Sequence, residues 1–196
     1  MQAITGRSLS PILRNESQSR RQSILIGKER HDIGRPDDGG YPVRGMVQGS
    51  YLYIANFAPD RWPAGNPETG YLNCDGSPTK TLLLESRTNT EMNEFWAWSF
   101  GKRPKEELYN IILDPACMNN LVKDDEQANR IMHMQGELFA RLRHEGDPRM
   151  LGRGHIFDEY PYADKRTANF YNRYMAGEKL KVGWVNESDF EEGPVE

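Results

Sequence analysis

The sequence has few cysteines, no long apolar run and no excess of basic residues, and each shortage excludes a class of protein. Its 196 residues contain two cysteines, Cys74 and Cys117, and no Cys-x-x-Cys pair, so we expect two free thiols rather than a disulfide framework or a cysteine metal site. No apolar run approaches the roughly 20 residues that a membrane span needs. The net charge is −4, whereas a duplex-binding domain carries a basic excess. We therefore expect neither a membrane nor a nucleic-acid partner.

Several catalytic motifs are missing as well. The sequence contains no Walker-type loop, no GxGxxG, no GxSxG and no HExxH. The doublet Asp37-Asp38 could bind a hard cation, but loops favour aspartate without one. The histidines do not stand at metal-ligand spacing from one another, so we predict no metal site in this chain. They are His31, His133, His144 and His155.

Short runs of branched and aromatic residues predict the strands of a β-sheet. Residues 23–27 (SILIG) form an apolar run closed by glycine, which predicts a buried strand. Residues 41–57 contain two β-rich runs on either side of Gln48-Gly49-Ser50, which predicts a hairpin with a glycine in its turn. Residues 107–112 (ELYNII) predict another strand.

Helix signals dominate the rest of the chain. Ser77-Pro78 can cap and begin a helix, and residues 90–100 predict a second one whose aromatic side chains should pack in the core. The clearest helix covers residues 124–144, and residues 163–175 could form a short one. The apolar stripe of the clearest helix follows 3- and 4-residue spacing. It consists of Ala128, Ile131, Gln135, Leu138 and Leu142, with Met134 beside it.

These elements predict an α+β fold, a small antiparallel sheet of about four strands with a long C-terminal helix packed on it. We divide the chain into a connector (1–22), an α+β unit (23–148) and a polar, aromatic-rich extension (149–196). A long loop rich in proline and glycine, residues 58–76, interrupts the unit. Such loops are usually functional or disordered, and the anchors Trp62 and Tyr71 favour an ordered one.

One charged cluster follows the first predicted strand directly. It runs from Lys28 through Glu29, Arg30 and His31 to Asp32. Arginine offers a planar fork for sulfate, phosphate or carboxylate, and histidine can donate a hydrogen bond to an anionic oxygen. A solvated strand end would contain the same residue types without any site. The pattern alone leaves both interpretations open.

The amino-acid sequences of several segments are more informative than these general patterns. They are GRSLSPIL (6–13), ILIGKERHD (24–32), GYPVRGMVQGSYLYIANF (40–57) and ELYNIILDPACMNNL (107–121). Together, and in this order, they resemble the C-terminal part of a sulfatase. The segment RWPAGNPETGYLNCDGSPTK (61–80) is similar to the branch related to heparan N-sulfatase, or sulfamidase. The resemblance implies the same fold, a small antiparallel sheet of about four strands packed by a long helix.

The catalytic motif of that family is absent from this sequence. Sulfatases make formylglycine from the first residue of C/S-x-P-S-R, but Cys74 begins CDGSP and Cys117 begins CMNNL. We therefore expect a C-terminal piece of a longer protein, without catalytic residues or a cofactor of its own and inactive alone. Formylglycine and calcium would belong to the missing catalytic domain. That domain would precede the connector and would also carry any targeting signal, and the family suggests a periplasmic or secreted location.

The resemblance also implies a substrate site and partners. The subdomain would lean on the catalytic domain and help to wall a pocket for a sulfated carbohydrate. Glu29, Arg30, His31 and Asp32 are the predicted substrate-binding residues. Arg44 is a weaker candidate, because its position in a strand suits a structural ion pair equally well. An orphaned docking face would favour self-association of the chain. The alternatives are a free-standing module that binds anionic glycans or another partner without chemistry, and a remnant without function.

Overall fold

The computed structural model describes residues 8–16 and 22–192. The predicted connector therefore lies partly outside the described residues. Its described part contains one short helix, α1 (Ser10–Leu13), which begins with a proline in its first turn. None of the described helices is both long enough and apolar enough to cross a membrane. Both cysteines are free thiols, as the sequence predicts.

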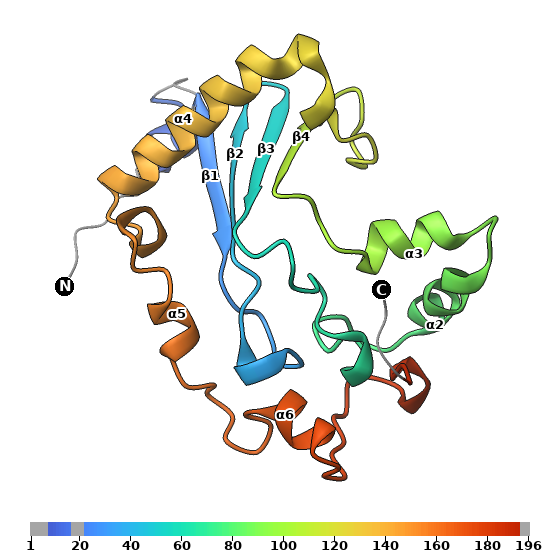
Figure 1. Cartoon of the computed structure of the whole chain (residues 1–196). Coiled ribbons are helices and arrows are strands. Elements are labelled where there is room, and N and C mark those ends of the chain that lie inside the picture. Colours follow the sequence, from blue (N-terminus) through green and yellow to red (C-terminus); the bar gives the residue numbers. More distant parts are fainter. Residues whose placement is uncertain (1–7, 17–21, 193–196) are drawn as a thin grey trace.

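Four antiparallel strands form the sheet, in the order β1-β2-β3-β4 (Figure 1). The strands are β1 (Ser23–Lys28), β2 (Val43–Gln48), β3 (Tyr51–Asn56) and β4 (Glu106–Asn110). Strands β2 and β3 are the predicted hairpin, and their last paired residues are Gln48 and Tyr51. Gly49 takes a positive φ of 57° in the turn between them, a conformation that favours glycine.

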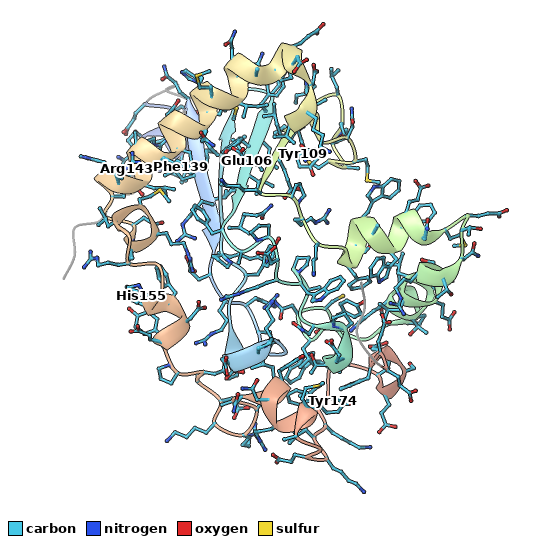
Figure 2. All side chains as sticks on the ribbon, in the orientation of Figure 1. Glu106, Tyr109, Phe139, Arg143, His155 and Tyr174 are labelled. Carbon is cyan, nitrogen blue, oxygen red and sulfur yellow. The ribbon has the colours of Figure 1, made fainter. Side chains whose placement is uncertain are left out.

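The long helix α4 (Ala128–His144) runs across one face of the sheet (Figure 1). The two layers share one apolar core, in which Leu138 of α4 is fully buried. Its buried members are Met46, Tyr53, Ala55, Leu108, Met134, Leu138 and Leu142. At the β4 side, the side chain of Glu106, which Figure 2 labels, accepts a hydrogen bond from Gln135 of α4. The α+β fold predicted from the sequence is confirmed.

The predicted apolar stripe of α4 needs two corrections. The helix begins at Ala128 rather than at Asp124, because residues 121–123 and 125–127 wind into 3-10 turns. Asp124 caps the second of these turns, and its side chain accepts a hydrogen bond from the Glu126 amide. Ala128 is exposed, whereas Met134 is buried. Met134 therefore belongs to the buried stripe of α4, beside which the sequence pattern placed it, and Ala128 does not.

Strand β1 is not the buried strand that its apolar run predicts. It lies at one edge of the sheet, and the side chains of Ile24 and Ile26 are 47% and 43% exposed. Side chains alternate between the two faces of a strand, and Ser23 contacts Glu137 of α4. Ile24 and Ile26 consequently point to the face of the sheet away from α4.

The long loop 58–76 is ordered around an aromatic cluster. Trp62 and Tyr71 are buried together with Phe100, the last residue of α3 (Asn93–Phe100). Helix α2 (Pro78–Glu85) begins as predicted, because the Ser77 side chain accepts a hydrogen bond from the Lys80 amide. The expected core role of the α3 aromatics holds for Phe100. It is wrong for Phe95 and Trp98, which are exposed and contact each other edge to face.

The C-terminal segment 149–192 passes through α5 (Ile156–Glu159) and α6 (Phe170–Met175). Helix α6 is shorter than the helix predicted over residues 163–175. Phe170 is buried against Ile33 and Leu72, which belong to the loops that follow β1 and β3. The Trp184 indole also donates a hydrogen bond to the Leu72 carbonyl at 2.9 Å. These contacts hold the C-terminal segment against the loops at the lower end of the sheet in Figure 1.

Candidate functional site

The predicted site residues come together where β1 ends and β2 begins. Strand β1 ends at Lys28, so Glu29 to Asp32 start the loop that leads to β2. Gly27 of β1 pairs with Arg44 of β2, which brings Arg44 next to this loop. The antiparallel pairing of β1 and β2 therefore gathers five residues from two segments at one end of the sheet.

Glu29 and Arg44 belong to a network of ion pairs. The Glu29 carboxylate accepts hydrogen bonds from the Arg44 guanidinium and from Arg149, whose Nη2 lies 2.6 Å from Glu29 Oε2. On the other side, Arg44 Nε donates to Asp147 Oδ2 at 2.6 Å. Burial alone would lower the pKa of Arg44, but its hydrogen bonds to Asp147 and Glu29 raise that pKa. The structural ion pair considered for Arg44 is what the structure shows.

Aromatic rings enclose the same network. The guanidinium carbon of Arg149 lies 5.4 Å from the ring centre of Phe157 and 5.9 Å from that of Phe57. Arg44 lies 6.0 Å from the Phe157 ring. Cations over aromatic faces gain electrostatic attraction. The rings therefore add to the ion pairs that support this end of the sheet.

Arg30 and Asp32 point their polar atoms at the C-terminal segment. Arg30 Nη2 donates to the Tyr160 carbonyl at 2.8 Å, and the guanidinium lies 5.6 Å from the Tyr162 ring centre. Asp32 Oδ1 accepts hydrogen bonds from the Ile33 amide at 2.8 Å and from the Tyr162 hydroxyl at 3.1 Å. Burial, and then Asp32, raise the pKa of Tyr162. Both loop residues thereby attach the segment that follows α5.

His31 differs from its neighbours. Its side chain is exposed, and the described part of the chain gives its imidazole no hydrogen bond and no ion pair. Among the five predicted residues, His31 therefore has its polar atoms free for a ligand.

A second ion pair fixes α5 against this loop. The Asp158 carboxylate accepts hydrogen bonds from Arg61 Nη2 at 3.2 Å and from the Gly40 amide at 3.2 Å. Burial would raise the pKa of Asp158, but the hydrogen bonds from Arg61 and Gly40 outweigh it and lower that pKa. Sequence reasoning missed Arg61, Asp147, Arg149 and Asp158. Their partners lie about a hundred positions away in the chain, and no local pattern marks them.

The acidic doublet that could have bound a cation is used within the fold. Asp38 Oδ2 accepts a hydrogen bond from the Asn169 amide at 2.6 Å, and Asp37 Oδ1 accepts one from Asn172 Nδ2 at 2.7 Å. Across residues 8–16 and 22–192, no three His, Cys, Asp or Glu side chains come close enough together to hold a metal ion.

The chain is similar in structure to a solved protein, although it matches no family model and no curated protein. Among solved structures, the chain is similar to BT1596, a 2-O GAG sulfatase, with 17% sequence identity and a TM-score of 0.44. The similarity covers 74% of this chain and 21% of that chain, so this chain spans about a fifth of the length of that protein.

Proposed function

We propose that this chain is the C-terminal, pocket-forming part of a sulfatase that hydrolyses sulfate esters or N-sulfates of a sugar. The observation that carries the proposal is the place of the family-like segments in the fold. ILIGKERHD contributes most of β1 and the loop after it, GYPVRGMVQGSYLYIANF contains the β2–β3 hairpin, and ELYN lies in β4. Three of the four segments that resemble the family thus contribute the strands of one sheet, and the described part of the fourth contains α1.

The finer assignment to the sulfamidase-like branch depends on the segment 61–80. This segment forms an ordered loop around Trp62 and Tyr71, followed by the start of α2. A loop of this length without regular structure is usually functional when it is ordered. Its position next to the end of the sheet suits a wall of a substrate pocket. A periplasmic or secreted location follows from the same resemblance.

The missing catalytic domain would dock on the open face of the sheet. Ile24 and Ile26 expose apolar surface there, and large exposed apolar patches often mark interaction sites. Formylglycine and calcium would reside in that domain. This chain would bind and orient the sugar. The isolated chain would associate with itself through the same face.

Within this proposal, His31 contacts the sulfated sugar, while Glu29, Arg30, Asp32 and Arg44 hold the loop in place. In the complete enzyme, His31→Ala should lower kcat/KM for a sugar substrate about 10- to 150-fold, the effect of losing a charged hydrogen bond. A small aryl sulfate that does not reach the loop should be much less affected. Wild-type kcat/KM with both substrates would exclude His31 from the pocket.

Activity assays test the proposed function directly. The purified chain should not turn over an aryl sulfate or an N-sulfated glucosamine, with calcium present, because it lacks the nucleophile. Turnover should begin only when the chain is produced together with an upstream domain that carries C/S-x-P-S-R. Turnover by the chain alone, abolished by a point mutation within it, would contradict the proposal. So would an upstream reading frame that encodes no such domain.

A non-catalytic module that binds anionic glycans is the second candidate. The ion pairs of Glu29, Arg44 and Arg149 favour it, because they satisfy the charges at the end of the sheet within this chain and need no other domain. Such a module should bind a sulfated oligosaccharide with equal affinity whether or not a catalytic domain is present. The sulfatase proposal instead expects the affinity to increase when the catalytic domain completes the pocket.

A further inference from the structure

A second charged cluster lies beside the site and takes no part in its ion-pair network. Lys28 Nζ lies 5.5 Å from the ring centre of Tyr41, and the guanidinium carbon of Arg35 lies 5.8 Å from the same ring. Among the residues that the structure describes, neither cation forms a salt bridge with a carboxylate. Two positive charges without a salt-bridge partner therefore lie close to the Tyr41 ring.

Arg35 is the more deeply buried of the two cations. Its side chain is 1% exposed, and it donates hydrogen bonds to the carbonyls of Trp62 and Pro63, both at 2.7 Å. Carbonyl oxygens satisfy the donors but do not neutralise the charge, and a buried charge without a counter-ion is unfavourable. Burial, and then the nearby Arg61, lower the pKa of Arg35 to about 10. Arg35 therefore creates a positive potential near the Tyr41 ring.

Tyr41 adds a polar group that has no partner. The residue is 3% exposed, and its hydroxyl makes no hydrogen bond within the described part of the chain. Buried polar groups nearly always have a partner, so an orphaned one needs an explanation. Burial, and then the Glu107 carboxylate, raise the pKa of Tyr41 to about 12, so the hydroxyl keeps its proton. It is a donor without an acceptor.

Two acids act on the cluster through their charge, Asp32 on Arg35 and Glu107 on Tyr41, but neither forms a salt bridge with its cations. Glu107 is buried, and its carboxylate already accepts hydrogen bonds from Asn56 Nδ2 at 2.7 Å and from the Tyr109 hydroxyl at 2.6 Å. Lys28 is exposed as a residue, although burial and then the charge of Arg35 lower its pKa. Lys28 is thus the member of the cluster that an anion reaches from solvent.

We infer that Lys28, Arg35 and Tyr41 form a subsite for an oxyanion, the sulfate or carboxylate group of an acidic sugar. The Lys28 ammonium contacts the oxyanion, the Tyr41 hydroxyl gives it the unused donor, and Arg35 attracts it through the field of its buried charge. The inference deepens the proposed function, on which it rests. It adds a binding group outside the predicted Glu29–Asp32 loop.

Thermal unfolding of the chain in sulfate tests the subsite. Sodium sulfate is titrated at constant ionic strength, with chloride as the balancing ion, into the wild type, Lys28→Met and the control Lys179→Met. Lys179 is also an exposed lysine but lies in the C-terminal segment. Sulfate stabilises proteins generally by exclusion, so that contribution should be equal in all three. The wild type and the control should show an additional saturable increase in Tm. Lys28→Met should need at least about tenfold more sulfate to reach it. Equal responses in all three would overturn the inference.

Tyr41→Phe provides a second, independent measurement. Removing an orphaned hydroxyl should leave the anion-free chain as stable as the wild type, or more stable, because an unpaired buried polar group is unfavourable. The same variant should bind sulfate more weakly. Unchanged sulfate affinity would overturn the role of the hydroxyl and with it the subsite. Loss of stability in the anion-free chain would also overturn it, since the hydroxyl would then have a partner within the fold.

Sodium glucuronate in place of sulfate distinguishes the two sources of the oxyanion. A saturable increase in Tm with glucuronate that is lost in Lys28→Met identifies a uronate subsite. The same result with sulfate identifies a sulfate subsite. A response to neither anion would overturn the inference. None of these results changes the outcome of the activity assays with a catalytic domain, so the sulfatase proposal and the subsite can fail separately.

Discussion

The Lys80 ammonium group lies 3.2 Å from the Asp189 carboxylate, and both side chains are fully buried. Lys80 Nζ also donates hydrogen bonds to the carbonyls of Gly70 at 2.7 Å and Cys74 at 2.8 Å. One ammonium group thus joins α2, the loop 58–76 and the C-terminal segment. This contact explains how a loop with little regular structure is held in one conformation.

Lys80→Met should destabilise the chain by about 3–5 kcal/mol, because it leaves the Asp189 carboxylate buried without a counter-ion. The free energy of unfolding, measured by urea titration, checks this value. Adding Asp189→Asn to Lys80→Met should recover part of the loss, since the second substitution removes the orphaned charge. A loss below about 1 kcal/mol for Lys80→Met would show that the pair does not hold the loop.

Leu138→Ala should destabilise the chain by about 2–5 kcal/mol, the usual range for a fully buried leucine. Leu138 lies in the core between α4 and the sheet, whereas Met132 of the same helix is 67% exposed. Met132→Ala is therefore the matched control and should change the free energy of unfolding by less than about 0.5 kcal/mol. Equal effects of the two substitutions in urea titrations would mean that α4 does not pack on the sheet through this face.

The elements that were predicted correctly have local causes. The β2–β3 hairpin follows from two runs of branched residues with Gly49 in the turn between them. The start of α2 follows from Ser77 and Pro78, a cap and a first-turn proline. Helix α4 follows from its 3- and 4-residue spacing. In each case, the residues that decide the structure are close together in the sequence.

What the sequence did not reveal depends on contacts between distant segments. The Glu29 carboxylate looked free for a ligand because its partner Arg149 lies in another part of the chain. Strand β1 looked buried because an apolar run does not show whether a strand lies at the edge or in the centre of a sheet. The aromatic pair Phe95 and Trp98 looked like core residues, because composition does not show which face of a helix is covered.

Alanine substitution should lower the stability of the fold at Arg30 but leave it almost unchanged at the adjacent His31. Arg30→Ala removes the hydrogen bond to the Tyr160 carbonyl and the contact with Tyr162, so we expect a loss of about 1–3 kcal/mol in the free energy of unfolding. His31→Ala should change it by less than about 0.5 kcal/mol, because the imidazole is exposed. Limited proteolysis should cut Arg30→Ala faster near residues 158–162. If His31→Ala is destabilised as much as Arg30→Ala, the imidazole has a structural role that the described contacts do not show.

The ion pair between Arg61 and Asp158 should make stability depend on pH in the acid range. Burial would raise the pKa of Asp158, but the hydrogen bonds from Arg61 and Gly40 lower it below the value in the unfolded chain. A carboxyl group of this kind stabilises the fold fully above its unfolded pKa of about 3.9, and the contribution disappears as pH falls through the lower folded pKa. The difference in free energy of unfolding between the wild type and Asp158→Asn should therefore stay constant from about pH 7 to 5 and shrink below about pH 4. Urea titrations at each pH measure it, and a difference that persists unchanged to about pH 2 would contradict the lowered pKa.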